Sequence, residues 1–272
     1  MSFYERDSGA ARIAAAYDQR LVPWLFAHWA DPLLEMAAVQ PSNHVVDLAC
    51  GTGLITRALV RRLDEDGHIY GVDLDPVMLA RAAATVNRPQ VTWHEADAGH
   101  LPLETSTIDV VVCNQGLQFF PDRDVVLAEV RRILRPGGRL ALAVWGRLEA
   151  NPWPAVMAEA VGEFLGDDAR AGTESVCALG DSDRVRTVLA GAGFVDIDIA
   201  EVEHTAHHRD VQDAIDGQLA AVPFAESIDA LGPDRRSELI DTMADHLANY
   251  TAPNGALDVA SSSVLAVATV PL

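Results

Sequence analysis

The chain has 272 residues, 49% of them hydrophobic, which is enough for one large α/β domain or for a core domain with a small cap. Its formal net charge is −20, and all 20 of its basic residues are arginine. So acidic a composition argues against nucleic-acid and anionic-membrane partners, because both require a basic face on the protein. Cys50, Cys113 and Cys177 have no close spacing, so we expect neither a metal site nor a disulfide framework.

The first forty residues are helical by pattern and rich in alanine. Helix patterns cover residues 8–19 and 22–39, with an interruption near Pro23. No apolar run reaches the roughly 18 residues of a membrane span, and residues 1–7 lack the basic start and apolar centre of a signal peptide. We therefore expect a cytoplasmic protein of bacterial type, and we assign residues 1–40 to an N-terminal helical lid.

Residues 44–145 alternate apolar runs with helix patterns, as expected for a parallel sheet with right-handed crossovers. The apolar runs lie at 44–49, 68–73, 90–95, 108–113 and 138–145, and the helix patterns at 54–64, 76–86 and 122–134. The tripeptide Pro136-Gly137-Gly138 predicts a helix stop and a turn.

The pattern loosens after Trp145. We expect an amphipathic helix at 151–165, a polar loop at 166–180, a helix at 181–192 and a strand at 194–199. Asp181 or Ser182 is the expected N-cap of the third of these elements, and Gly193 its stop. Two further helix patterns, 210–221 and 233–250, precede a last strand at 261–270.

The predicted fold is α/β, a Rossmann-like and mainly parallel seven-stranded sheet with helices on both faces and a helical lid. Residues 41–209 form its core in this prediction, residues 210–256 a helical insertion that belongs to the lid, and residues 257–272 the final strand of the core sheet.

The first two strands end in carboxylates that flank a glycine-rich turn. Small residues at Ala49, Gly51 and Gly53 allow a ligand to approach the backbone closely. Asp73 lies 22 residues after Gly51 (73 − 51), about where a dinucleotide fold places the acid that binds ribose hydroxyls. The pattern predicts a nucleoside pocket at the carboxyl ends of two parallel strands, for either a nicotinamide or flavin dinucleotide or S-adenosylmethionine.

Three details favour S-adenosylmethionine. Thr56 stands where the dinucleotide fingerprint has its third glycine. Asp47 at the mouth of the turn repels a pyrophosphate but attracts the ammonium of a methionine moiety. At two further strand ends, Asp97 could accept a hydrogen bond from an adenine amino group, and Asn114 could offer a carbonyl to the cofactor amine.

Five motifs resemble, in order, those of the class I S-adenosylmethionine-dependent methyltransferases, in particular the small-molecule group that is similar to the ubiquinone and menaquinone biosynthesis enzymes. They fall within roughly residues 41–146 and are Asp47-Leu48-Ala49-Cys50-Gly51-Thr52-Gly53, Gly71-Val72-Asp73-Leu74-Asp75-Pro76-Val77-Met78-Leu79, Asp97-Ala98 followed by Leu101-Pro102, Phe119-Phe120-Pro121-Asp122, and Arg131-Arg132-Ile133-Leu134-Arg135-Pro136-Gly137-Gly138-Arg139-Leu140. The resemblance implies that residues of the first motif surround the methionine moiety, that the second motif holds the ribose and adenine, and that the third lies at the adenine edge. The candidate cofactor residues are Asp47, Ala49, Cys50, Gly51, Gly53, Asp73, Leu74, Met78, Ala96, Asp97, Ala98, Asn114 and Gln115.

The chain departs from this family's pattern in two places. Ala49 replaces the family's commonest glycine, which is a mild change. The family often has a pair of histidines before the Phe-Pro-Asp segment, whereas this chain has Gly116-Leu117-Gln118-Phe119. A histidine role at that site is therefore not carried over.

Catalytic residues are weakly specified by the sequence. Methyl transfer requires alignment above all, and a base only when the acceptor must lose a proton early. His28, His204 and His207 are weak candidates, because a helical histidine among aromatic residues usually packs and a cluster that follows a strand is usually solvated. The candidate substrate contacts are Tyr17, Trp24, Gln118, Phe119, Trp145 and Arg209, and the resemblance implies that a tyrosine of the N-terminal segment approaches the methionine carboxylate.

The sequence thus predicts a methyltransferase that uses S-adenosylmethionine, yields S-adenosylhomocysteine and acts by in-line displacement on a small, apolar or aromatic molecule. Two alternatives stay open: an NAD(P)-dependent oxidoreductase, and a non-catalytic protein that binds S-adenosylmethionine. Exposed apolar faces on the N-terminal helices are compatible with a homodimer.

Overall fold

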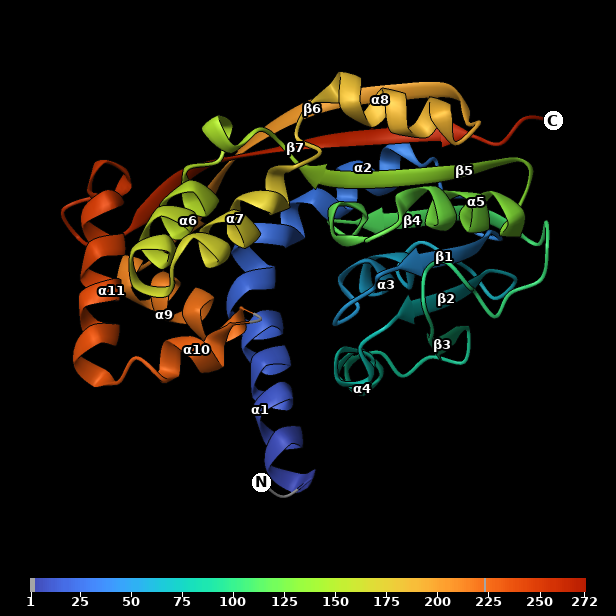
Figure 1. The fold of residues 1–272 in the computed structure, drawn as a ribbon. Coiled ribbons are helices and arrows are strands. Elements are labelled where there is room, and N and C mark those ends of the chain that lie inside the picture. Colours follow the sequence, from blue (N-terminus) through green and yellow to red (C-terminus); the bar gives the residue numbers. More distant parts are fainter. Residues whose placement is uncertain (1–2, 223) are drawn as a thin grey trace. The chain divides into compact units, whose positions relative to one another are not determined.

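A computed structural model describes residues 3–222 and 224–272, and within them it forms a seven-stranded sheet of order β3-β2-β1-β4-β5-β7-β6 (Figure 1). The strands are β1 (His44–Leu48), β2 (His68–Asp73), β3 (Val91–Glu95), β4 (Ile108–Asn114), β5 (Leu134–Trp145), β6 (Val195–His208) and β7 (Leu257–Thr269). The predicted Rossmann-like α/β fold is confirmed.

Parallel pairing joins the first five strands. β1 pairs with β2, where Asp47 faces Gly71, and also with β4, where Asp47 faces Val112. β2 pairs with β3 and β4 with β5, again in parallel, whereas β7 is antiparallel to β5. The strand order reverses between β1 and β4, and open α/β sheets bind ligands outside the carboxyl ends of their strands at such a switch point.

Helices cover both faces of the parallel strands because successive strand residues point to opposite sides. Val46 and Val111 pack with α5 (Arg123–Ile133) and α8 (Ser182–Gly191) in one buried cluster. Val45 and Val110 pack with α2 (Ala30–Met36) and α3 (Leu54–Leu59) in another. The next helix along the chain, α4 (Pro76–Thr85), begins at Asp75, whose carboxylate caps the amides of Val77 and Met78.

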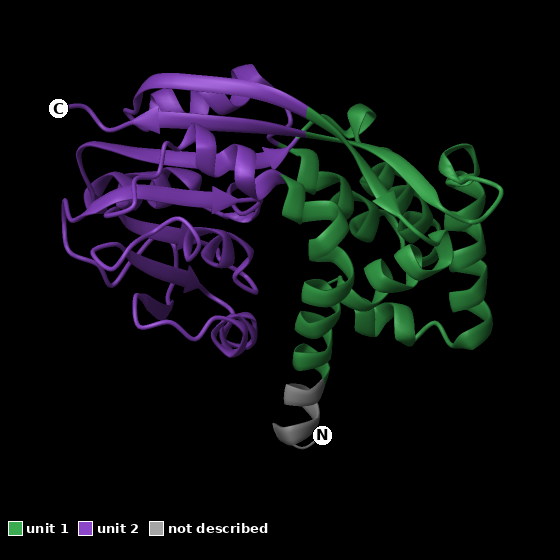
Figure 2. Ribbon diagram, turned by 180° about the vertical axis from the view of Figure 1, so that it is seen from behind, with its two compact units in different colours: residues 1–28, 146–178, 203–262 green, residues 29–145, 179–202, 263–272 purple. Residues whose placement is uncertain are grey.

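The described residues divide into two compact units (Figure 2). Unit 2, residues 29–145, 179–202 and 263–272, contains the parallel strands. Unit 1, residues 1–28, 146–178 and 203–262, is built mainly from helices. Its helices are α1 (Phe3–Ala16), the π-helix η1 (Tyr17–Phe26), α6 (Pro152–Leu165), α7 (Asp167–Glu174), α9 (Val211–Ala221), α10 (Ala225–Asp229) and α11 (Pro233–His246). Residues 146–178, which we predicted within the core, group with unit 1.

Several local predictions are confirmed. The carboxylate of Asp181 accepts hydrogen bonds from the first turn of α8, and Gly193 follows that helix with φ of +81°. The predicted interruption near Pro23 is the π-helix, in which Pro23 lies. Proline cannot donate the backbone hydrogen bond of a regular helix interior, which accounts for an altered winding there.

Other local predictions are wrong. Residues 166–180 are not a loop: α7 begins at Asp167, and the side chain of Arg170 pairs with Glu174 one turn later. β6 continues to His208 instead of ending near 199, so the histidines expected after the strand lie in it. Among the described residues, no helix has the length and apolar character needed to cross a bilayer.

Candidate functional site

The turn after β1 is tied to the end of β2 by its backbone. The Cys50 N–H donates to the Val72 carbonyl across 3.0 Å, and the Gly51 N–H donates to Asp73 Oδ2 across 2.7 Å. Ala49, Gly51 and Gly53 have φ of +55°, +51° and +85°, the left-handed region that favours glycine. The left-handed backbone of the turn therefore favours small residues at these three positions. The bond from Gly51 to Asp73 ties the turn to the end of β2.

Gly51 is the position of this turn that is open to a ligand. A Cβ built on Gly51 meets no atom within 4 Å, whereas one on Gly53 comes within 3.2 Å of the Ala82 Cβ. Gly53 is thus needed where the turn packs on α4. Gly51 presents bare backbone to open space, as the sequence predicted for a cofactor turn.

Asp73 is held by two backbone amides. Its Oδ2 accepts from Gly51, and its Oδ1 accepts from the Asp75 N–H across 3.0 Å. Burial raises the pKa of the Asp73 carboxyl, while the bonds from these two amides act in the opposite direction. A half-buried carboxylate with spare lone pairs, held by two amides, can accept hydrogen bonds from a pair of ribose hydroxyls.

A cavity of about 340 Å³ opens beside Asp73 in unit 2. Its walls are mainly apolar, and they contain three large hydrophobic side chains that are unusually exposed: Leu74 (67%), Phe119 (59%) and Val125 (43%). The lining residues are Leu48, Ala49, Val72, Asp73, Leu74, Ala96, Asp97, Ala98, Gly99, His100, Phe119, Phe120, Pro121, Asp122, Val125 and Val126. An apolar slot with a few convergent polar groups is the usual form of a small-molecule site.

The structure brings six of the predicted cofactor residues into this cavity, namely Ala49, Asp73, Leu74, Ala96, Asp97 and Ala98. Phe119, predicted as a substrate contact, lines the same cavity. Asp97 Oδ1 accepts from the Gly99 N–H across 2.7 Å, which fixes the loop that follows β3. The cavity thus combines mainly apolar walls with the carboxylates of Asp73, Asp97 and Asp122, a combination that suits an adenine ring and its ribose.

Asp47 lies in the protein interior, outside the lining of this cavity. It is 1% exposed, and its Oδ2 accepts from the Thr56 N–H (2.8 Å) and hydroxyl (2.6 Å). Burial raises the pKa of Asp47 to about 7, and the bonds from Thr56 oppose that rise. Thr56 stands where a dinucleotide fingerprint has its third glycine, and a glycine has no hydroxyl to donate to Asp47. The hydrogen bond from the Thr56 hydroxyl therefore depends on this departure from the fingerprint.

The end of β4 contributes a buried amide cluster. Gln115, with φ of +60°, donates from Nε2 to Ser263 Oγ across 3.0 Å, and Gln118 Nε2 donates to the Gln115 carbonyl across 3.0 Å. Gly116 lies against the turn after β1: a Cβ there would come within 2.8 Å of the Ala49 Cβ. Sequence reasoning missed Ser263 and the packing role of Gly116.

The remaining cofactor candidates do not line the cavity. Cys50 is buried, and burial together with the charges of Asp47 and Asp73 raises the pKa of its thiol. Met78 lies in the first turn of α4, where its N–H faces the capping carboxylate of Asp75. Asn114 ends β4, and its Oδ1 is buried without a hydrogen-bond partner among the described residues.

Substrate and catalytic candidates from the helical part lie in unit 1. Trp24 packs edge-on against Trp153 at 4.8 Å between ring centroids, and Tyr17 lies 5.5 Å from Phe26. His28 stacks on His204 at 3.9 Å. Burial, with the charge of His204 as a second cause, lowers the pKa of His28 to about 4. His28 is therefore a neutral imidazole at pH 7.

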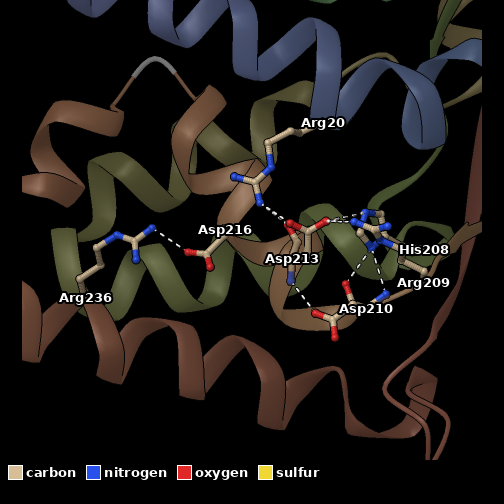
Figure 3. Close-up of polar contacts among 7 residues, drawn as sticks. All are labelled: Arg20, His208, Arg209, Asp210, Asp213, Asp216 and Arg236. Carbon is tan, nitrogen blue, oxygen red and sulfur yellow. Dashed lines mark hydrogen bonds and ion pairs between the residues drawn. The ribbon is translucent and has the colours of Figure 1, made fainter.

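Figure 3 shows where Arg209 and its neighbours lie in unit 1. Arg209 is largely exposed, with a guanidinium nitrogen 3.9 Å from Asp213 Oδ2. Asp213 also accepts from Arg20 across 2.7 Å and faces His208 Nε2 at 3.7 Å. Arg209, one of the predicted substrate contacts, thus faces a carboxylate of the protein.

Two other candidates occupy ordinary structural positions. His207 is exposed and pairs with Asp258. Trp145 is buried at the end of β5. Within residues 3–222 and 224–272, no group of three or more histidine, cysteine, aspartate or glutamate side chains has the geometry to hold a metal ion.

Comparison with known proteins adds to this geometry. Residues 46–142 match the model of a family described as a methyltransferase domain. The chain is 29% identical over 206 residues to an arsenite methyltransferase of Halobacterium salinarum, covering 73% of this chain and 49% of the relative. It is 37% identical over 117 residues to a demethylmenaquinone methyltransferase of Lactiplantibacillus plantarum, covering 42% of this chain and 49% of the relative.

Solved structures show the same fold. Phosphoethanolamine N-methyltransferase 2 of Haemonchus contortus, in complex with S-adenosyl-L-methionine, superposes with a TM-score of 0.60 at 17% identity, over 98% of this chain and 57% of that one. The chain spans about half the length of the two curated relatives described above.

Proposed function

Because the core of this chain is a class I S-adenosylmethionine-dependent methyltransferase domain, we propose that the protein transfers a methyl group from S-adenosylmethionine to a small-molecule acceptor and releases S-adenosylhomocysteine. One observation carries the proposal: the cavity next to the Gly51–Asp73 bond, with its exposed apolar walls.

The residues present suit this cofactor. Gly51 faces open space, Asp73 has lone pairs for ribose hydroxyls, and the side chains of Leu74 and Phe119 are exposed at the cavity. The Oδ1 of Asn114 is a buried acceptor without a partner among the described residues, as the predicted role toward the cofactor amine requires. These features support binding of an adenosine that bears an amino-acid moiety.

When bound, S-adenosylmethionine supplies a methyl group activated on a sulfonium, and the sulfur leaves as a neutral thioether. The protein's part in such a reaction is alignment: it holds a nucleophile about 3–3.5 Å from the reacting carbon and in line with the breaking bond. Asp73 would hold the ribose of the bound cofactor, and the exposed side chains of Leu74, Phe119 and Val125 would pack on its adenine. Charge is dispersed in this displacement, so no oxyanion hole is needed.

We propose an acceptor that needs no strong base. His28, with a pKa lowered to about 4, is a weak proton acceptor, and His207 is an exposed residue paired with Asp258. One relative is named for the methylation of arsenite and the other for the methylation of demethylmenaquinone, and both of these acceptors are small molecules. We propose an apolar or aromatic acceptor.

Methyl transfer can be tested directly. The protein is incubated with S-adenosylmethionine labelled on the methyl group and with separate acceptors, namely a menaquinol-type hydroquinone, a catechol, a thiol and arsenite. We expect acceptor-dependent S-adenosylhomocysteine with at least one acceptor, and its loss in Asp73→Ala. Binding of S-adenosylmethionine without turnover on any acceptor would favour a non-catalytic binding protein instead.

A further inference from the structure

One wall of the cavity in unit 2 is a short segment whose two ends are joined by Arg123. Residues 119–122 follow one another in the chain, and all four line the cavity. Arg123, the next residue, reaches back across them. Its Nε donates to the Leu117 carbonyl at 3.1 Å, and its Nη2 donates to the Gln118 carbonyl at 2.9 Å. The guanidinium thereby ties the end of this wall to its beginning.

The helix that contains Arg123 gives no reason for an arginine at this position. Arg123 is the first residue of α5, directly after the cap Asp122, and a cation in the first turn of a helix is opposed by the helix dipole. A guanidinium has donors in a planar fork and no acceptor, so it can serve two adjacent carbonyls at once. The two bonds to the 3-10 turn η3 (Leu117–Phe119) therefore account for the residue type.

The ring of Phe119 depends on its backbone for its position. Phe119 is 59% exposed, so packing does little to fix its side chain. Its N–H donates to the Gly116 carbonyl at 3.0 Å on one side, and Arg123 holds the two preceding carbonyls on the other. Gln118 is buried, so its carbonyl would be costly to leave without this donor. Loss of Arg123 should therefore loosen the turn that carries the ring.

A wall that is ordered before a ligand arrives removes the free-energy cost of ordering it on binding. We propose that Arg123 is a positioning residue of the cofactor site: by holding the carbonyls of Leu117 and Gln118, it keeps the ring of Phe119 where the ring can stack on the adenine. The inference rests on the proposed function, since it presupposes that S-adenosylmethionine binds in this cavity.

The test is a double-mutant cycle between Arg123 and Phe119, with the calorimetric affinity for S-adenosylhomocysteine as the readout. Methionine keeps an unbranched stem but has no donor, so Arg123→Met should bind S-adenosylhomocysteine about tenfold more weakly than wild type. In Phe119→Ala there is no ring to position, and adding Arg123→Met should then weaken binding by about twofold or less. A purely structural role of Arg123 would cause the same loss in both backgrounds.

Two further variants complete the design. Arg123→Lys keeps the charge and lacks the fork, so it repeats the cycle with a smaller perturbation, and its loss of affinity should also shrink in Phe119→Ala. Arg186→Met is the matched control, because the Arg186 guanidinium donates to the Ile197 carbonyl at 2.8 Å in the same unit and outside the lining of the cavity. This control should bind S-adenosylhomocysteine as wild type does.

Equal affinity of wild type and Arg123→Met for S-adenosylhomocysteine would overturn the assignment. An equal loss with and without the Phe119 ring would also overturn it, because Arg123 would then not act through Phe119. The proposed function fails separately, if wild type binds neither S-adenosylmethionine nor S-adenosylhomocysteine.

Discussion

The Gly51 N–H donates to Asp73 Oδ2 across 2.7 Å, so the glycine turn after β1 and the acid that ends β2 form one assembly although 22 residues separate them. The spacing that indicated a ribose acid in the sequence is therefore also the spacing that closes this bond. Asp73 holds the turn, and we expect it to have a second task, which is to bind the ribose of the cofactor.

The two tasks of Asp73 can be separated by substitution. In Asp73→Asn the amide oxygen can still accept from Gly51, while the bond from the Asp75 N–H is lost with the second carboxylate oxygen. We expect about a tenfold loss of affinity for S-adenosylhomocysteine, chiefly from the lost charge. In Asp73→Ala both tasks fail, and we expect about a hundredfold loss or more. Calorimetric titration measures both, with Asp229→Asn, on the exposed pair with Arg12, as the matched carboxylate control. Equal affinities for the two Asp73 variants would contradict the double role.

Phe119 should contribute through its ring. It is 59% exposed and lines the cavity, so it is available to stack on a base. Phe119→Ala should weaken S-adenosylhomocysteine by about tenfold, the scale of base–aromatic stacking, and Phe119→Leu by less. Circular dichroism melts of both variants should match wild type because an exposed side chain carries little packing. An unchanged affinity in Phe119→Ala would place the adenine elsewhere.

Asp47 gives the stability of the fold a pH dependence. Its folded pKa of about 7 lies above the ordinary value, so the stability that it contributes is complete below about pH 4 and is lost as the pH rises through 7. Asp47→Asn cannot ionise, yet its Oδ1 can still accept from Thr56. Its free energy of unfolding relative to wild type should therefore rise by about 3 kcal/mol between pH 5 and pH 8. Urea unfolding at both pH values measures this, and parallel curves for the two proteins would refute the raised pKa.

Gly116 and Ala49 should be coupled in stability. A Cβ on Gly116 would stand 2.8 Å from the Ala49 Cβ and 2.9 Å from Cys113 Sγ, so Gly116→Ala should cost about 1–3 kcal/mol. Ala49→Gly removes the nearer atom and suits the φ of +55° at that position. The double variant should recover part of the loss, and strictly additive free energies in the cycle would contradict the contact.

Much of unit 2 could be predicted from the sequence because its signals are local. Apolar runs of strand length, the residue types of the glycine turn and the Asp181 cap each act within a few residues. The position of the cavity was predicted from the carboxyl ends of two such runs, which end at Asp47 and Asp73. These elements are also where the motifs of the family resemblance lie.

The parts that could not be predicted depend on contacts between distant residues. The burial of Asp47 under Thr56 and the brace from Gln115 to Ser263, 148 residues away, have no local signature. Helix α7 was missed because its sequence, with one buried residue, lacks an apolar stripe. The predicted strand at 194–199 was shorter than β6 because the residues of β6 are mostly exposed and its polar end resembles a loop.

Calorimetric titration of the purified protein with S-adenosylmethionine, S-adenosylhomocysteine and NAD in parallel tests the central claim most directly. The structure of the site predicts binding of both sulfur nucleosides, competition between them for one site, and no heat with NAD. Binding of NAD without either sulfur nucleoside would contradict the account and would make Asp73 the ribose acid of an oxidoreductase.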